Sequence, residues 1–300
     1  MKSLNPQDLP TAELHQLLLG SVGPRPIALA STISGDGSVN LSPFSFFNVF
    51  SAHPPILIFS PARRVRDNTT KHTLENAKET SEVVINVVTY AMTEQMSLSS
   101  TEYGRETNEF IKSGFTELPS EQVGPPRVAE SPVQFECTVR EIVPLGTEGG
   151  AGNLILAEIL RMHINEQILN DQGKIDPYRI DLIARMGGDW YCRAQGDALF
   201  QVAKPTRKKG IGVDALPTNI RESFILTGND LGKLGNVESI PGPEEIKEYA
   251  QSVAMRNLLE SASDGHEIRE ILHQYAAQLL EKGDVHNAWK TLLCDPLNRA

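Results

Sequence analysis

The 300-residue chain has a mass of 33.0 kDa, a formal net charge of -10, and 40% hydrophobic against 22% charged residues. These proportions are ordinary for a folded globular protein and exclude the disordered and fibrous classes. The acidic excess disfavours nonspecific binding to nucleic acid, although a local basic cluster can still hold a small anion.

The sequence also bears on compartment and redox state. No apolar run approaches the length of a membrane span, and the start of the chain lacks the basic residues and hydrophobic core of a signal peptide. Cys137, Cys192 and Cys294 are widely spaced and odd in number, which argues against a disulfide framework and against a structural zinc site. We therefore expect a cytoplasmic protein with reduced thiols, no membrane partner and no metal.

The first predicted elements are a helix and a hairpin. Leucines at helical spacing follow Thr11 and predict a short helix that ends at Gly20. Residues 27–33 have the apolar and β-branched content of a buried strand, and 34–38 contain an Asp-Gly hairpin signal.

Residues 40–55 combine four phenylalanines with serine and asparagine. Pro43, Pro54 and Pro55 exclude a regular helix and a central sheet strand, because proline lacks an amide donor and restricts the residue before it. We expect extended, irregular backbone rich in aromatic side chains here.

A buried strand at 56–59 precedes a basic segment. This segment is followed by a predicted helix at 71–80, for which 68–70 are candidate caps. A helix N-terminus beside several cations suits an anion of the phosphate type, whereas the alternative is a solvated loop with ordinary surface charges. The cations are Arg63, Arg64, Arg66 and Lys71.

Later strands decide the fold class. The glycine run at 146–152 lacks the Walker lysine and the GxGxxG spacing, so we interpret it as a turn between paired strands. Strands joined by turns, with few helices, favour an antiparallel barrel over a Rossmann sheet. The other expected elements are strands at 82–89, 133–143, 153–164 and 198–203, two helices before residue 114, and a short helix at 177–186.

The character of the chain changes after residue 205. Pro243 begins one predicted amphipathic helix that continues to Leu258, and a second runs from Ile268 to Leu280. We expect a first domain at 1–205 and a helical extension at 206–300 that carries no chemical motif.

Several motifs occur in an order that resembles a known family. GPRPIALAST, NLSPFSFFNVFSAHPP, KHTLEN, VVINVV, AEILRMHI and ARMGGDWY resemble the flavin reductase-like proteins, including flavoredoxins, over about residues 20–205. The resemblance implies a mainly β or α+β fold, with an antiparallel Greek-key split barrel that binds FMN and forms a homodimer. His72 stands where the family usually has aspartate, and the helical extension lies outside the common domain.

FMN needs an apolar ring surface, hydroxyl partners for the ribityl chain and cations for the phosphate. Burial of on the order of 200 Å² of ring contributes roughly 5 kcal/mol, short of the ~8 kcal/mol of micromolar binding, so the phosphate must also be held. The resemblance implies the following residues: Pro43, Phe44, Ser45, Phe46 and Asn48 at the ring edge, Ser31, Thr32 and Ser42 at ribityl or phosphate oxygens, and Arg63, Lys71 and Thr73 at the phosphate.

The resemblance implies an oxidoreductase that passes hydride from NADH or NADPH to the flavin and on to a second flavin or other acceptor. This chemistry obliges no side chain to act as acid or base, so we assign no catalytic residue. Two alternatives stay open: a flavoredoxin-like protein that takes electrons from a protein partner, and a nonenzymatic split-barrel binding module.

Three further features each have two interpretations. His163 lines a substrate pocket if the family strand is followed, or is a structural histidine. Trp190 and Tyr191 cap the ring or close the core. A last basic group contacts a phosphate of NADPH or forms a solvated linker; it consists of Lys204, Arg207, Lys208 and Lys209.

Overall fold

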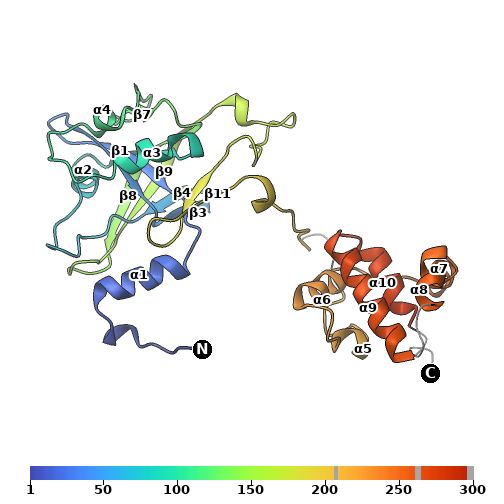
Figure 1. The fold of residues 1–300 in the computed structure, drawn as a ribbon. Coiled ribbons are helices and arrows are strands. Elements are labelled where there is room, and N and C mark those ends of the chain that lie inside the picture. Colours follow the sequence, from blue (N-terminus) through green and yellow to red (C-terminus); the bar gives the residue numbers. More distant parts are fainter. Residues whose placement is uncertain (206–208, 261–264, 296–300) are drawn as a thin grey trace. The chain divides into compact units, whose positions relative to one another are not determined.

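The computed structural model describes residues 1–205, 209–260 and 265–295. The chain divides into two compact units, Met1–Phe200 (unit 1) and Gln201–Ala300 (unit 2). Unit 1 is a sheet with helices around it, whereas the described residues of unit 2 form helices and turns (Figure 1). The sequence placed the change of character after residue 205, in the same part of the chain.

Unit 1 is built on one sheet of seven strands in which every neighbouring pair is antiparallel. This confirms the antiparallel sheet and excludes a Rossmann arrangement for these strands. In spatial order the strands are β2 (Val39–Phe44), β1 (Ala28–Ile33), β5 (Glu82–Val87), β8 (Val133–Pro144), β9 (Asn153–Ile164), β4 (Pro55–Phe59) and β3 (Phe47–Ala52).

The sheet curls so that its two ends approach each other. The ring centroids of Phe44 on β2 and Phe59 on β4 lie 5.5 Å apart, although these strands belong to opposite ends of the strand order. Both side chains belong to one core cluster, which also contains Ala28 and Ala30 of β1. Because the core is shared between the two ends of the sheet, the result is an open, or split, barrel.

Both edge strands come from the proline-containing stretch at 40–55. The backbone is extended as expected, and its irregularity is confined within the strands to a register shift of β3 between Val49 and Ser51. The N–H of Leu41 on β2 points away from β1 and donates to Glu109 Oε2 at 3.0 Å. Residue 43 has the same orientation because strand geometry alternates, so Pro43 removes no ladder hydrogen bond. The prolines thus exclude a central strand but permit an edge strand.

The predicted hairpin and the predicted helices around the basic segment are present. Ile33 pairs with Val39 across the Asp-Gly turn, where Gly37 has φ +90°. The other helices of unit 1 are α1 (Thr11–Ser21), α2 (His72–Thr80), α3 (Thr93–Leu98) and α4 (Glu109–Ser113), so the first helix continues one residue past Gly20. Lys71 is the N-cap of α2 and no side chain caps it, so the capping role expected for 68–70 is wrong.

Two other predictions near the end of unit 1 are wrong. Residues 177–186 contain a turn and the strand β10 (Ile183–Arg185) instead of a helix, because Asp176 Oδ1 accepts the N–H groups of Tyr178 and Arg179 and a bridge from Thr89 extends the chain at Leu182. Residues 198–203 form no strand. The remaining short elements are β6 (Glu117–Leu118), β7 (Arg127–Val128), β11 (Tyr191–Arg193) and 3-10 turns at Pro6–Asp8, Tyr90–Met92, Glu166–Ile168 and Gly196–Ala198.

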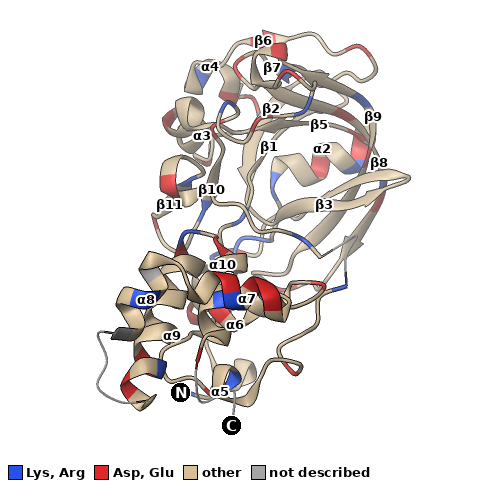
Figure 2. Cartoon of the chain, turned by 90° about the vertical axis from the view of Figure 1, so that its right-hand side faces the viewer, with Lys and Arg blue, Asp and Glu red and all other residues tan. Residues whose placement is uncertain are grey.

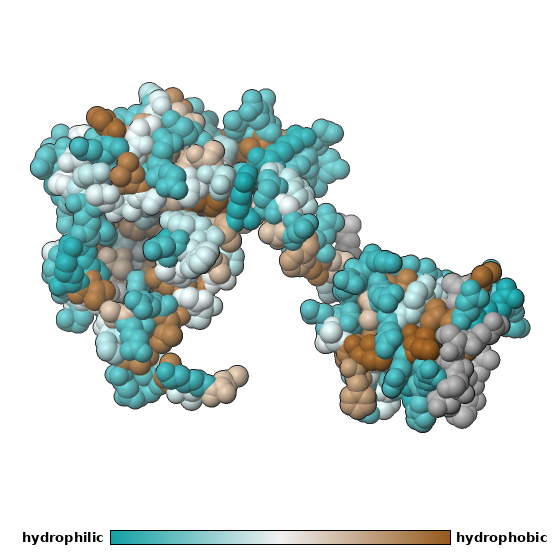
Figure 3. Space-filling view, viewed as in Figure 1, coloured by the Kyte–Doolittle hydropathy of each residue, from teal (hydrophilic) through white to brown (hydrophobic). Residues whose placement is uncertain are grey.

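Unit 2 is a small helical bundle with its own core. Trp289 lies at its centre, and its Nε1 donates to the carbonyl oxygen of Leu234 at 3.1 Å. The helices are α5 (Thr218–Arg221), α6 (Gly228–Gly235), α7 (Pro243–Ala250), α8 (Val253–Glu260), α9 (Gly265–Glu281) and α10 (Val285–Leu293). Figure 3 shows hydrophobic side chains on the viewer's face of this unit between hydrophilic ones.

One predicted helix of unit 2 is confirmed and the other is divided. The pattern from Ile268 to Leu280 lies within α9, whereas the pattern from Pro243 to Leu258 spans α7 and α8. The division falls at Ser252, whose Oγ accepts the N–H of Met255 and so begins a new helix. Across the described part of the chain, no helix has the length and apolar content of a membrane span.

Candidate flavin site

Three adjoining pockets lie within unit 1, and β2 lines two of them. We name them by their characteristic side chains. The arginine pocket is lined by His15, Ala62, Arg63, Arg64, Val65, Arg66, Lys71, Glu102 and Gly150. The hydroxyl pocket is lined by Asn40, Ser42, Arg64, Lys71, His72, Thr73, Ser99, Ser100, Thr101, Glu102, Tyr103 and Glu109. The tyrosine pocket is lined by Ile27, Pro43, Ser45, Met96, Ser97, Ser100, Arg185 and Tyr191.

The three pockets form one continuous surface because neighbouring pockets share lining residues. Arg64, Lys71 and Glu102 line both the arginine and the hydroxyl pocket. Ser100 lines both the hydroxyl and the tyrosine pocket. The surface therefore changes from cationic, through hydroxyl-bearing, to largely apolar.

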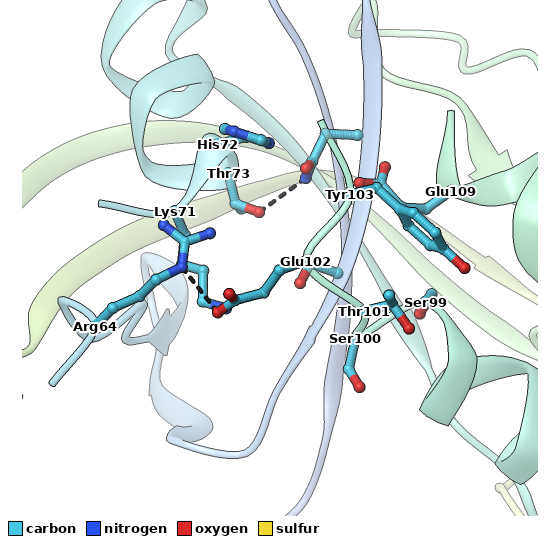
Figure 4. A pocket seen from close by; sticks show the side chains of 12 residues that line it. Arg64, Lys71, His72, Thr73, Ser99, Ser100, Thr101, Glu102, Tyr103 and Glu109 are labelled. Atoms are coloured by element: carbon cyan, nitrogen blue, oxygen red, sulfur yellow. Dashed lines mark hydrogen bonds and ion pairs between the residues drawn. The ribbon is translucent and has the colours of Figure 1, made fainter. Parts of the chain in front are cut away.

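The cations of the arginine pocket converge on one carboxylate. Glu102 accepts from Arg64 Nε at 2.9 Å, and Lys71 Nζ lies 3.6 Å from it (Figure 4). Glu102 also accepts from Arg66 Nη2 at 2.6 Å. The hydrogen bonds from the two arginines hold the pKa of Glu102 at about 2. Burial, followed by repulsion from Arg64, lowers the pKa of Lys71.

A tight loop positions these cations. Asp67 Oδ1 accepts both the N–H and the hydroxyl of Thr69, and Asn68 adopts the left-handed conformation with φ 57°. The Arg63 guanidinium bonds to this loop, through Nε to Asn68 Oδ1 at 2.6 Å and through Nη2 to the Asn68 carbonyl at 2.5 Å. Arg64, rather than Arg63, is consequently the arginine that reaches into both pockets.

Polar side chains of three elements meet in the hydroxyl pocket. Asn40 of β2 donates through Nδ2 to Thr73 Oγ1 of α2 at 2.8 Å. Glu109 of α4 closes another side through its bond to the N–H of Leu41, and burial raises the pKa of this glutamate. Its walls therefore offer hydroxyl, amide and carboxyl groups.

The tyrosine pocket has flat walls and one cation. The Arg185 guanidinium carbon lies 4.6 Å from the centroid of the Tyr191 ring. A more polar pocket adjoins it, lined by Thr93, Glu94, Ser97, Ser100, Arg185, Asp189 and Tyr191. Tyr191 thus faces these pockets, while the neighbouring Trp190 side chain is 77% exposed.

The structure brings six of the twelve predicted site residues to this surface. Ser42, Lys71 and Thr73 line the hydroxyl pocket, and Pro43 and Ser45 line the tyrosine pocket. Arg63 lines the arginine pocket, and Ser45, Phe46 and Asn48 line a separate apolar groove along β3.

Three predicted cofactor residues lie beneath the surface instead. The Phe44 side chain is buried in the barrel core, so only its backbone is available to a ligand. Thr32 Oγ1 accepts from Asn76 at 3.2 Å and supports Asn40 from behind. Ser31 is fully buried on β1, and its hydroxyl has no hydrogen-bond partner within the described residues.

His163 on β9 is occupied by a structural contact. Its Nε2 donates to Glu136 Oε1 at 2.6 Å, and Glu136 also accepts the N–H groups of Glu121 and Gln122. Burial raises the pKa of Glu136, but these hydrogen bonds outweigh burial and hold it below its usual value. Within the described residues, His163 lines none of the five pockets described for unit 1. The basic group near residue 204 cannot be placed as a whole, since Arg207 and Lys208 lie outside the described residues.

Sequence reasoning missed the loop after α3. Ser99, Ser100, Thr101 and Glu102 line the hydroxyl pocket, yet the sequence shows only a polar stretch near a helix. The repeated hydroxyl side chains from Ser97 to Thr101 were the available signal. Arg185 lies in the motif ARMGGDWY, but a helix at 177–186 does not predict its position in the tyrosine pocket.

Comparison with known proteins agrees with this fold. The family profile described as "Flavin reductase like domain" matches residues 20–178. An uncharacterized protein of Aquifex aeolicus is 39% identical over 189 residues, which cover 63% of this chain and 94% of that protein. The chain therefore belongs to the flavin reductase-like family.

Two solved structures resemble unit 1 in fold and in sequence. Nitrilotriacetate monooxygenase component B from Bacillus cereus is 27% identical, with a TM-score of 0.63 over 67% of this chain and 98% of that one. A putative flavin reductase with a split barrel domain from Shewanella frigidimarina is 26% identical, with a TM-score of 0.57 over 66% of this chain and 96% of that one. Unit 1 is thus a split barrel of the flavin reductase type.

Proposed function

We propose that this chain binds FMN and reduces it with NADH or NADPH, after which the electrons pass to a second flavin or another acceptor. The observation that supports this proposal is the spatial order of the arginine, hydroxyl and tyrosine pockets. FMN has a dianionic phosphate, a hydroxylated chain and an apolar ring in the same order. Family membership supports an oxidoreductase that uses flavin.

The residues present fit FMN. Arg64, Arg66 and Lys71 supply charge-assisted donors for the phosphate, with Arg63 stabilising the loop that carries them. The hydroxyl pocket offers partners for the ribityl chain, above all Ser42, Thr73 and the Ser99–Thr101 segment. Pro43, Ser45 and Tyr191 provide flat or small surfaces for the ring in the tyrosine pocket.

The role of the protein is to bind, orient and shield. When bound, FMN supplies the hydride chemistry, so the chain needs no acid or base of its own. Pro43 and Met96 restrict water on one side of the tyrosine pocket, while the adjoining polar pocket around Arg185 and Asp189 leaves room for a nicotinamide. We therefore assign no catalytic residue.

We also propose a homodimer formed near the β3 edge. Val49 and Phe50 on this edge strand are 63% and 65% exposed, and they adjoin the apolar groove lined by Phe46 and Asn48. Light scattering of the purified protein would test the dimer, because a mass of about 33 kDa rather than twice that value would reject it.

The central experiment has two steps. The purified protein is first titrated with FMN, and binding should change the flavin fluorescence; no change would reject the proposed cofactor. NADH or NADPH is then added to the FMN-loaded protein without oxygen, and the flavin absorbance should bleach rapidly. Binding without bleaching would favour the flavoredoxin-like alternative or a nonenzymatic binding module.

A further inference from the structure

Glu102 lies at the centre of the cations that suit a phosphate. Its two carboxylate oxygens lie 2.9 Å from Arg64, 2.6 Å from Arg66 and 3.6 Å from Lys71. Figure 4 shows the Glu102 side chain directed at Arg64 and Lys71, away from Ser99 and Tyr103. An acidic side chain thus uses the donors that an anionic ligand would need.

A phosphate ester cannot share this position with the carboxylate. Both groups present negatively charged oxygens to the same guanidinium and ammonium donors. Two like charges at contact distance repel strongly in a partly desolvated pocket. The phosphate dianion has three oxygens and about twice the charge of the carboxylate, so it is the stronger partner for three cations. One of the two anions must therefore leave.

Glu102 is the anion that can move. It lies in the loop between α3 and α4, and its side chain is 39% exposed. Within the described residues its backbone N–H and carbonyl form no hydrogen bond, whereas its neighbours Thr101 and Tyr103 donate to Leu98 and Thr101. Arg64 is less free, because its Nη1 also donates to Thr69 Oγ1 at 2.9 Å and to the Thr70 carbonyl at 2.5 Å.

We propose that Glu102 is an intramolecular competitor for the flavin phosphate, displaced when FMN binds, and that it makes the site selective for a phosphate dianion. A neutral flavin gains nothing from displacing it, whereas FMN gains the three cations. This inference rests on the proposed function, since it assumes that the arginine pocket holds the phosphate.

The test compares Glu102→Gln with Glu106→Gln, using FMN and riboflavin as probes. Riboflavin lacks the phosphate, and Glu106 is an exposed glutamate of the same loop with no ion pair within the described residues. Because exposed ion pairs contribute modestly, Glu102→Gln should bind FMN roughly tenfold more tightly than the wild type. Its riboflavin affinity should be unchanged, and Glu106→Gln should match the wild type with both ligands.

Three results would overturn the inference. Weaker or unchanged FMN binding by Glu102→Gln would make Glu102 a positioning residue for the cations or irrelevant to them. Equal tightening for FMN and riboflavin would assign the effect to the ring or ribityl chain. Equal tightening by Glu106→Gln would reduce it to general surface charge. If the wild type binds neither flavin, the proposed function itself fails, which is a different result from these three.

Discussion

The two units differ in where their interacting charged and polar side chains lie. In unit 1, three cations surround one partly exposed carboxylate in a pocket. In unit 2, the fully buried Asp295 pairs with Arg269 at 2.6 Å, and the buried His273 bonds to Ser223 Oγ through Nδ1 at 2.7 Å. A surplus of cations beside solvent suits a ligand, whereas charges paired inside a helical core mainly fix the packing.

The comparison with relatives follows the same division. The flavin reductase profile matches only 20–178, all within unit 1. Unit 2 has surface charge as well, for example Glu244 and Glu245 in the first turn of the acidic helix α7 (Figure 2). None of the five pockets described above involves unit 2. We therefore expect substitutions in unit 2 to leave the flavin affinity of unit 1 unchanged, and substitutions at the pockets of unit 1 to leave the stability of unit 2 unchanged.

The largest expected effect is on the stability of unit 2. Trp289 is 1% exposed and fills the centre of the helical core, so Trp289→Ala should lower the free energy of unfolding by about 3–5 kcal/mol. Urea unfolding of the full chain, followed by helical circular dichroism, measures this loss. Trp190→Ala is the matched control, since that exposed side chain should contribute little. A large fall in FMN affinity in Trp289→Ala would contradict the independence of the two units.

The next effect concerns the cations of unit 1. Lys71→Ala should weaken FMN binding by roughly 10- to 100-fold, because a hydrogen bond to a charged group contributes about 1.5–3 kcal/mol. Riboflavin affinity should stay the same in a parallel fluorescence titration. Lys78→Ala removes an exposed lysine from the same helix and serves as the control. Equal loss in both variants would point to helix stability or net charge instead of a phosphate contact.

Local patterns predicted the elements well but could not select between equivalent side chains. Strands such as 27–33 and 153–164 are predicted by their own composition and by turn signals within a few residues of their ends. Arg63 and Arg64 have identical chemistry, and their different roles depend on Asn68 and on the distant Glu102. The contact that distinguishes them joins Arg64 to Glu102 across 38 positions of the chain, which a local sequence pattern does not reveal.

Two tertiary contacts explain other differences. The expected helix at 177–186 had suitable composition, but the turn at Asp176 and the bridge between Thr89 and Leu182 impose extended backbone. Phe44 belongs to the motif that predicted the site, yet the curling of the sheet turns its ring into the core beside Phe59. A motif identifies the strand, while the closure of the barrel decides which side chains remain accessible.

A smaller effect should distinguish the units by pH. Burial lowers the pKa of His273 in unit 2. The charge of Asp295 partly offsets this lowering, and the charge of Arg269 adds to it. The unfolded state then binds a proton more readily than the folded state as the pH falls through about 6.5, so this histidine costs stability at low pH. Helical unfolding should therefore show lower stability at pH 5.5 than at pH 7.5. His273→Gln should have a flatter pH profile, and an equally steep one would reject His273 as the cause.

The smallest expected change is that of His163→Gln, which tests whether His163 belongs to the site or to the framework. Glutamine can still donate to Glu136, so His163→Gln should keep FMN affinity and the rate of anaerobic bleaching within about twofold of the wild type. His163→Ala should lower the free energy of unfolding by about 1–3 kcal/mol, because it removes a partner from a buried carboxylate. Slower bleaching in His163→Gln at unchanged FMN affinity would instead assign this histidine to the nicotinamide side. The contrast between the two variants matters because a framework residue responds to the lost hydrogen bond, while a substrate residue responds to the lost imidazole.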